Sequence, residues 1–163
     1  MSESALQLHN IPPVYDEHST RLILGSFPSV LSRRTDFFYG HPQNRFWKVL
    51  AEVFDCKVPV TVAEKRQLVL SHHLALFDVI ARCEIAGSAD SAIKNVVPNH
   101  LSPILKNSKI TEIFVNGKTA EKYYNKYLRS ETGIDCICLP STSPANAAFS
   151  LDKLIESWKI IAE

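Results

Sequence analysis

The segment TRLILGS, residues 20–26, is a short apolar run that ends in a glycine. Such runs, bounded by turn residues, are typical of strands that are buried on both faces of a sheet. Three later runs have the same character, and segments with helical character separate all four. The later runs are LALFDVI (74–80), ITEIFVNG (110–117) and DCICLP (135–140). The pattern predicts four parallel strands with helices between them.

The intervening segments carry helix signals. Thr61 and Glu64 have the spacing of a capping box, and Ser150 is suited to cap the last helix. The expected helices are residues 43–55, 61–73, a short one within 98–108, 118–130 and 151–163. The predicted fold class is therefore α/β, a three-layer α/β/α sandwich around a four-stranded parallel sheet. A single domain over residues 1–163 is expected, with about residues 1–15 forming a loose N-terminal tail or arm.

Composition narrows the possible function classes. The chain has 163 residues, of which 45% are hydrophobic and 21% charged, and its formal net charge is +1. This balance provides no global basic field, so any nucleic-acid site must be a local patch. The sequence has no apolar run long enough to span a membrane and no signal-peptide pattern at its start. A cytoplasmic protein, intracellular with DNA, is the expectation.

Familiar cofactor and metal motifs are missing from the sequence. It contains no phosphate-loop motif, no G-x-G-x-x-G after the first strand and no G-x-S-x-G elbow. The four cysteines include no C-x-x-C pair, and the histidines lack metal-ligand spacing. We therefore expect neither a cofactor nor a metal site.

Ligands of open parallel sheets bind beyond the carboxyl ends of the strands. Four segments occupy those positions, and YGHPQNRFWKVL (39–50) follows closely after the first. The four are GSFPSVLSRR (25–34), DVIARCE (78–84), NGKTAEK (116–122) and LPSTSPANAAFS (139–150). Turn amides in Ser/Pro-rich loops can hold phosphates, aromatic rings can stack on bases, and amide side chains can orient water or read a base edge. Such a set is suited to a nucleotide whose base has been swung out of the duplex.

These segments, in this order, resemble the uracil-DNA glycosylase superfamily. YGHPQNRFWKVL is similar to the segment that opens the first long helix in the mismatch-specific uracil/thymine glycosylases. VNGKTA resembles the Gly-Lys turn of that branch, and LPSTSPANAAFSLDKLIESW resembles its second signature. The resemblance covers residues 20–162 and implies the glycosylase fold, with DNA that contains a damaged base as the partner.

One signature departs from the superfamily pattern. Two residues after its opening glycine, the first signature of the superfamily carries an Asp or Asn that positions the hydrolytic water. Here it reads Gly25-Ser26-Phe27-Pro28-Ser29. Phe27 has no polar atom with which to hold a water. The combination of GSFPS, GHPQN and LPSTSPAN is similar to the hypoxanthine-DNA glycosylases, in which the Asn of the HPQN segment is taken to supply the catalytic group. That residue is Asn44.

The resemblance assigns roles to further residues. Tyr39 would stack on the base, while Asn116 and the backbone amides near Phe27 would donate hydrogen bonds to it. Several short or basic side chains would contact the DNA, with residues 145–147 small enough to enter the space that the flipped base leaves. The expected DNA-binding residues are Ser29, Ser141, Ser143, Pro144, Asn146 and Lys118.

Simpler interpretations remain open for the same residues. Asn44 could be an ordinary helix cap and Asn116 an ordinary turn residue. His41 could either stabilise the turn or support a catalytic group. The Arg45-Phe46-Trp47-Lys48 run is expected to serve packing and the surface, and the fourth segment could be a plain Pro/Ser-rich connection.

The sequence thus predicts a monofunctional glycosylase that excises hypoxanthine from deoxyinosine and leaves an abasic site. Because no lysine lies in the catalytic segment, no Schiff base is expected. A monomer is expected, with no membrane and no metal as partner. The alternatives are a glycosylase for uracil or a broad set of deaminated bases, and a non-catalytic relative that binds DNA or nucleotides.

Overall fold

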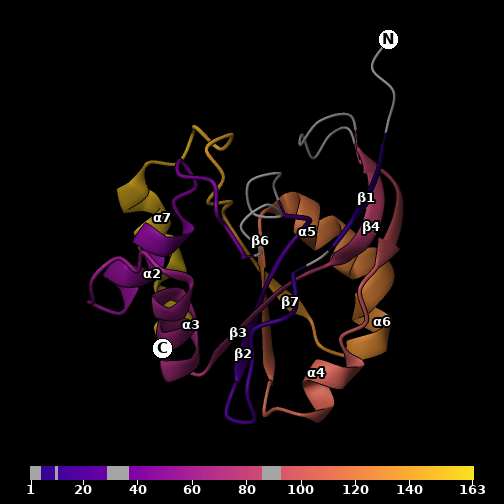
Figure 1. Ribbon diagram of the computed structural model, residues 1–163, viewed down its shortest axis with the longest axis horizontal. Helices are drawn as coiled ribbons and strands as arrows, with labels where there is room; N and C mark the ends of the chain where they lie inside the picture. Colours follow the sequence, from indigo (N-terminus) through magenta and orange to yellow (C-terminus); the bar gives the residue numbers. More distant parts are fainter. Residues whose placement is uncertain (1–4, 10, 29–36, 86–92) are drawn as a thin grey trace.

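The computed structural model describes residues 5–9, 11–28, 37–85 and 93–163. Its centre is a parallel sheet with the strand order β3–β2–β6–β7 (Figure 1). These strands are β2 (Arg21–Gly25), β3 (Leu74–Asp78), β6 (Glu112–Asn116) and β7 (Cys136–Leu139). They coincide with the four apolar runs of the sequence, so the predicted four-stranded parallel sheet is confirmed.

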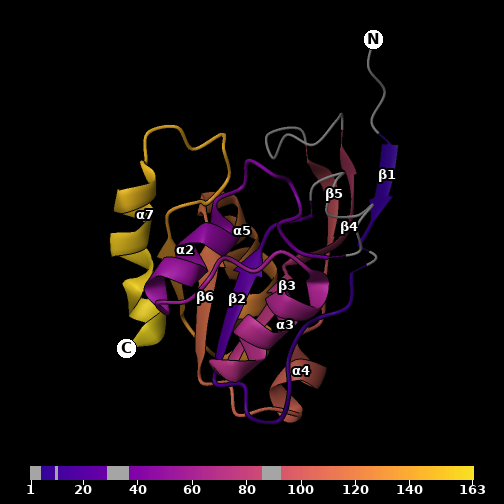
Figure 2. The ribbon, with the colours of Figure 1, turned by 60° about the vertical axis from the view of Figure 1, so that its left-hand side comes forward.

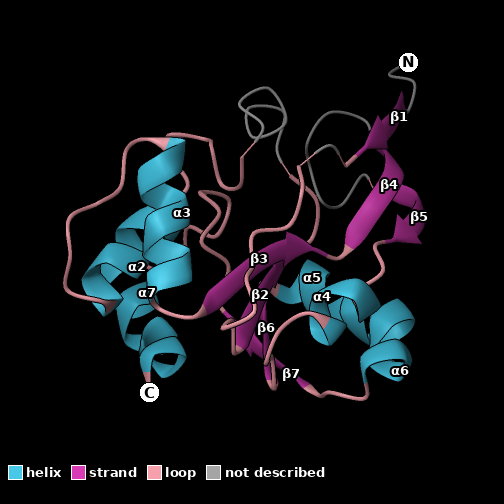
Figure 3. Ribbon diagram, turned by 60° about the horizontal axis from the view of Figure 1, so that its bottom comes forward, coloured by secondary structure: helices cyan, strands magenta, loops and turns pink. Residues whose placement is uncertain are grey.

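Helices cover both faces of the sheet and make the three predicted layers (Figures 1 and 3). One face carries α2 (Phe46–Val53), α3 (Val62–Ser71), α7 (Leu151–Trp158) and the 3₁₀ turn η3 (Lys159–Ala162). The other face carries α4 (Ser102–Lys106), α5 (Lys118–Tyr123), the π-helical turn η2 (Tyr124–Leu128) and α6 (Arg129–Thr132). Within the described residues, no helix is long and apolar enough to cross a membrane.

The helix ends follow the sequence signals. Thr61 and Glu64 form the expected capping box, with the Glu64 amide donating to Thr61 Oγ1 at 3.1 Å and the Thr61 amide donating to Glu64 Oε1 at 2.9 Å. Ser150 Oγ accepts from the Lys153 amide at the start of α7. Helix α2 begins at Phe46 rather than at residue 43, because residues 41–44 form a turn in which the Asn44 amide donates to the His41 carbonyl.

The core lies on the two faces of the parallel sheet. Leu22, Ile23 and Leu24 of β2 are fully buried. Phe46 and Trp158, on α2 and α7, meet edge to face with ring centroids 5.8 Å apart. The Trp47 indole is also buried, and its N–H donates to the Phe38 carbonyl at 3.2 Å. The aromatic residues of the NRFWK run therefore serve packing, as the sequence predicted.

A second, antiparallel sheet was not predicted. It consists of β1 (Ala5–Leu8), β4 (Ile80–Ile85) and β5 (Lys94–Pro98), in the order β1–β4–β5. It stands beside the carboxyl end of β3 (Figure 2). The run predicted as one strand over 74–80 ends at Asp78, and the chain then continues into β4.

The predicted loose N-terminal arm is therefore wrong for the described part of residues 5–15. Residues 5–8 pair with β4, and the Val14 amide and carbonyl exchange hydrogen bonds with Leu76 of β3 at 3.0 and 2.9 Å. Ile11 and Val14 are only 2% and 1% exposed. The prediction failed because the pairing partners of this segment lie more than sixty residues further along the chain.

Ile11→Ala should lower the free energy of unfolding by about 2–5 kcal/mol, because it leaves a cavity in a packed core. Leu8→Ala is the control, since Leu8 is 60% exposed and its loss should cost less than about 0.5 kcal/mol. Urea denaturation of both variants measures the difference. Equal and small effects would show that the N-terminal segment is loosely attached.

Candidate active site

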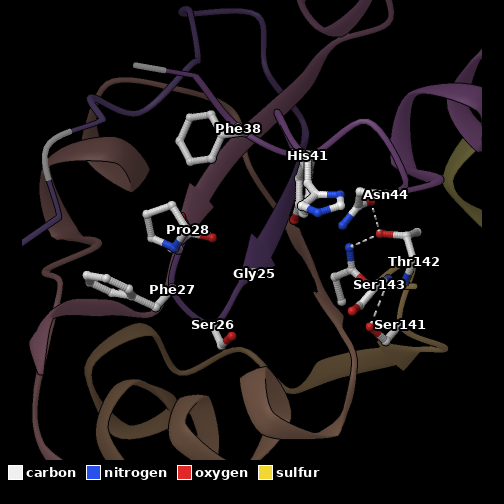
Figure 4. A pocket seen from close by; sticks show the side chains of 13 residues that line it. Gly25, Ser26, Phe27, Pro28, Phe38, His41, Asn44, Ser141, Thr142 and Ser143 are labelled. Carbon is white, nitrogen blue, oxygen red and sulfur yellow. Dashed lines mark hydrogen bonds between the residues drawn. The ribbon is translucent and has the colours of Figure 1, made fainter. Parts of the chain in front are cut away.

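A pocket opens at the carboxyl ends of the parallel strands, where the sequence placed the site (Figure 4). Its volume is about 140 Å³, smaller than the roughly 300–1,000 Å³ of pockets that hold drug-sized ligands. The pocket therefore has room for a single ring system rather than for a large cofactor. It is lined by residues 25–28, Phe38, Tyr39, His41, Asn44, Asp78, Asn116 and residues 141–143.

Thr142 joins three parts of this pocket through hydrogen bonds. Its side chain is fully buried. Asn116 Nδ2 donates to Thr142 Oγ1 at 3.0 Å, and Thr142 Oγ1 donates to Asn44 Oδ1 at 2.9 Å. The Thr142 amide donates to Asn116 Oδ1 at 3.0 Å, and its carbonyl accepts from the Arg45 amide at 3.1 Å. These hydrogen bonds thus connect the loops that follow β6 and β7 to the residues at the start of α2.

The same bonds fix the orientation of the Asn44 amide. Its Oδ1 accepts from the Phe46 amide at 3.0 Å as well as from Thr142, which fills the two acceptor positions of a carbonyl oxygen. Because the Phe46 amide can only donate, the oxygen must face it. The Asn44 nitrogen is left to point into the pocket (Figure 4). Asn44 therefore makes a cap-like bond and also presents two N–H donors to the pocket.

His41 stabilises the turn before α2. Its Nδ1 accepts from the Gln43 amide at 3.1 Å, and its carbonyl accepts from the Asn44 amide at 2.9 Å. The imidazole also lines the pocket, next to Asn44 (Figure 4). Of the two interpretations left open by the sequence, the turn-stabilising hydrogen bond is confirmed.

Arg45 holds the fourth loop in shape, a role that sequence reasoning missed. Its guanidinium donates to the Phe149 carbonyl, to the Ser143 carbonyl at 3.1 Å and to the Asn146 carbonyl at 3.0 Å. A rigid, planar fork of five donors is well suited to collecting several carbonyl groups in this way. The guanidinium of Arg45 therefore forms hydrogen bonds within the protein itself.

The serines of the fourth loop shape its turns. Ser141 Oγ accepts from the Ser143 amide at 3.1 Å, and Ser143 Oγ accepts from the Ala145 amide at 3.2 Å. Asn146 Nδ2 donates to the Ser141 carbonyl at 3.0 Å. Pro144 is exposed at the tip of the loop. Residues 145, 147 and 148 are small and exposed as well.

Tyr39 lies deeper than a simple stacking platform would. Its ring stacks on Phe46, with centroids 3.9 Å apart and an angle of 21° between the planes, so that protein covers one face. Its hydroxyl is buried and makes no hydrogen bond to any described residue. Burial, reinforced by the nearby Asp78 carboxylate and only partly offset by Asn116, raises the pKa of Tyr39 well above its ordinary value. The hydroxyl therefore remains protonated and can act as a donor.

Asp78 and His9 form a buried pair at the edge of the pocket, and sequence reasoning assigned neither to the site. His9 Nε2 lies 2.9 Å from Asp78 Oδ2, and both side chains are less than 5% exposed. Because an ionised carboxylate only accepts hydrogen bonds, Nε2 is the donor. The acidic residue that ends the apolar run LALFD was a visible signal for Asp78. No sequence pattern pointed to His9.

The remaining predicted residues are distributed unevenly. Phe27 lines the pocket, and its ring meets His9 edge to face at 6.0 Å. Lys118 is exposed at the start of α5 and does not line the pocket. Ser29 lies outside the described residues. Within the ranges that the structure describes, no cluster of three or more His, Cys, Asp or Glu side chains could hold a metal ion.

Two relatives with assigned names are similar to nearly the whole chain. A hypoxanthine DNA glycosylase of Methanosarcina acetivorans is 34% identical over 152 residues, which is 92% of this chain and 94% of the relative. A hypoxanthine DNA glycosylase of Methanosarcina barkeri is 31% identical over 144 residues, covering 86% of this chain and 89% of the relative.

Structure and family comparisons agree with these relatives. A solution NMR structure of a candidate uracil DNA glycosylase from Methanosarcina acetivorans superimposes with a TM-score of 0.80 at 28% identity, covering 98% of this chain and all of the other. The family described as the uracil DNA glycosylase superfamily matches residues 12–162. The chain therefore belongs to the uracil DNA glycosylase superfamily.

Proposed function

We propose that this protein is a monofunctional DNA glycosylase that hydrolyses the N-glycosidic bond of a flipped-out deaminated base, hypoxanthine first, and leaves an abasic site. The observation that carries the proposal is a base-sized pocket that Phe27 lines and into which the Asn44 amide points. By the sequence resemblance, Phe27 replaces the residue that usually holds the hydrolytic water. The two relatives named hypoxanthine DNA glycosylases support this choice of base.

The reaction places positive charge on the sugar and negative charge on the departing base. Hypoxanthine leaves more readily than adenine, because its lactam oxygen can share the negative charge. Donors that strengthen their bonds as this charge develops lower the barrier. The N–H groups of Asn44 can donate to the departing base in this way. Alternatively, they can donate to the attacking water and so hold it in position.

Asn44 acts here as a donor, because its oxygen is committed to Phe46 and Thr142. A neutral amide cannot remove a proton from water at neutral pH, so most of the catalysis falls on departure of the base. Asn116 is similarly committed to Thr142 through its oxygen and one N–H. Its part in the proposal is to brace the pocket rather than to act as a principal reader of the base.

The fourth loop is suited to the DNA strand around the lesion. The Ser141 and Ser143 hydroxyls accept from turn amides and keep their own O–H groups available to donate to phosphates. Pro144, with the small residues 145, 147 and 148, forms an exposed tip that can enter the space vacated by the base. Lys118, exposed at the start of α5, would add a phosphate contact. Asn146 supports the loop through its bond to Ser141.

The pocket-lining residues among those described include no lysine that could form a Schiff base. This supports simple hydrolysis without strand cleavage by the enzyme. We propose that it acts as a monomer. We place that action in the cytoplasm, on DNA that contains the damaged base.

Duplexes that contain deoxyinosine should be cleaved at least about tenfold faster than those that contain deoxyuridine, because Phe27 replaces the polar group on which uracil excision usually depends. Single-turnover assays with inosine, uracil, xanthine or ethenocytosine duplexes, followed by alkali, measure the rates. Equal cutting of inosine and uracil would contradict the assignment. Binding of all four without cutting would show a non-catalytic relative.

Asn44→Ala should slow inosine cleavage by about 100-fold or more, while the duplex is still bound, because the variant removes donors that act in the transition state. Asn44→Asp keeps an oxygen that can accept from Phe46 and Thr142, so this variant should fold normally. It should also retain measurable cleavage, because the second carboxylate oxygen can hold the water. Single-turnover rates and binding constants give the comparison.

Thr142→Val is the control for loss of bracing, because it removes the hydroxyl between Asn44 and Asn116 and leaves both amides in place. It should slow cleavage less than Asn44→Ala does. If Asn44 is only a helix cap, Asn44→Ala will lose about 1 kcal/mol of stability and remain fully active.

Cleavage of inosine duplexes should proceed at an unchanged rate in EDTA, because the hydrogen-bond donors of the protein provide the charge stabilisation. The measurement compares single-turnover rates before and after dialysis against EDTA. Activity that disappears in EDTA and returns with zinc or iron would overturn this expectation.

A further inference from the structure

Two polar atoms converge on the floor of the pocket above Gly25. A methyl group on Gly25 would lie 2.4 Å from Asp78 Oδ1 and 3.0 Å from the Tyr39 hydroxyl oxygen. A side chain at this position would therefore collide with the carboxylate, so the site requires glycine. Both atoms belong to residues that line the pocket, and the catalytic steps described above use neither.

The Tyr39 hydroxyl is held in place near the Asn116 side chain but without an acceptor for its own proton. It is buried and makes no hydrogen bond within the described part of the chain, although buried polar groups are nearly always bonded. The backbone of Tyr39 adopts a φ of 54°, which is strained for a residue with a side chain. The packed surroundings of Tyr39 hold this conformation in place. A ligand in the pocket would provide the missing acceptor.

The Asp78 carboxylate is also held so that one oxygen faces this space. Its Oδ2 accepts from His9 Nε2, and its Oδ1 is the atom nearest to the position that a Gly25 Cβ would occupy. The His9 ring is enclosed by Phe27, Phe38 and Phe77, with centroids 6.0, 6.2 and 5.1 Å away. Asp78 is therefore the polar partner that the structure shows for the imidazole, and the pair has little freedom to turn.

We propose that Tyr39 and Asp78 read the lactam edge of the flipped base, with the Tyr39 hydroxyl donating to the ring carbonyl and Asp78 Oδ1 accepting from the adjacent ring N–H. His9 is a positioning residue that directs this carboxylate oxygen. The proposal rests on the proposed glycosylase function and names the chemical class of base that the pocket reads, namely bases with a lactam edge, to which hypoxanthine, xanthine and uracil belong.

Deamination reverses the hydrogen-bonding pattern that such a pair can read. Adenine and cytosine present an amino donor next to a ring-nitrogen acceptor, whereas hypoxanthine, xanthine and uracil present a carbonyl acceptor next to an N–H donor. A site with one donor and one acceptor in fixed positions fits only the second pattern. A mismatched base leaves buried polar groups unpaired, which makes the discrimination large. Guanine and thymine present the same lactam edge, so their exclusion, like the choice between hypoxanthine and uracil, depends on other features of the pocket.

The test compares duplexes that carry hydrolysis-resistant 2′-fluorinated deoxyinosine with duplexes that carry 2′-fluorinated deoxynebularine, a purine without the carbonyl and the N–H. The wild-type protein should prefer the inosine duplex. Tyr39→Phe should reduce the ratio of the two binding constants by about 3- to 10-fold, and Asp78→Asn by about 10- to 100-fold, as expected for a neutral and a charged hydrogen bond. Single-turnover rates on unmodified deoxyinosine should fall in the same order.

The matched controls are Tyr123→Phe and Asp152→Asn, which lie on α5 and α7 outside the pocket and should leave the ratio unchanged. His9→Ala should lower the ratio in the same direction as Asp78→Asn. His9→Gln should recover part of the loss, because its amide can still donate to Asp78. A residue with a merely structural role would weaken both duplexes equally.

A ratio that stays at the wild-type value in Tyr39→Phe and Asp78→Asn would overturn the proposal, even if both variants were slower. So would a wild-type protein that does not distinguish the two duplexes. If the wild-type protein prefers the inosine duplex and the variants abolish that preference, but inosine is never excised, the reading of the base stands and the glycosylase function fails.

Discussion

The hydrogen bonds of the buried Thr142 are the constraint on which the pocket depends. They link Asn116 at the end of β6 to Asn44 before α2, so that two distant loops and a helix are positioned by one side chain. Because the same bonds use the oxygen of Asn44, they also decide that its N–H groups face the pocket. A small change in the β7 loop would therefore alter both the shape of the pocket and the orientation of its central amide.

In the pocket, the neutral amide and hydroxyl groups lie on one side, and the charged carboxylate lies at the buried floor. Amide and hydroxyl groups of Asn44, Ser141 and Ser143 lie on the side formed by the helix mouth and the fourth loop, where a sugar and its phosphates would be held. The carboxylate of Asp78 lies at the buried floor, with the imidazole of His9 as its partner. In the proposed reaction, neutral donors near the reacting bond would favour departure of an anionic base, and a carboxylate at the far edge would select that base without opposing the charge directly.

The packing around His9 explains why a phenylalanine is suited to position 27. Its ring packs against His9, together with two other phenylalanines, and so helps to enclose the buried pair of His9 and Asp78. The small antiparallel sheet contributes as well, because the chain reaches His9 directly after β1 has paired with β4. Arg45 rigidifies the opposite side by collecting carbonyl groups of the fourth loop. The pocket is thus held from two sides by elements that take no direct part in the chemistry.

The sequence by itself determined the parallel sheet, its covering helices and the edge at which the site lies. Apolar periodicity, caps and turn residues are local, and the segments GSFPS and GHPQN carry the resemblance within a few residues. Only the tertiary structure decided which atoms face the pocket. The Asn44 amide is oriented by Thr142, 98 residues away, and Asp78 is held by His9, 69 residues away. Hydrogen bonds between such distant residues leave no periodic pattern in the chain, because they depend on how the strands and loops meet after folding.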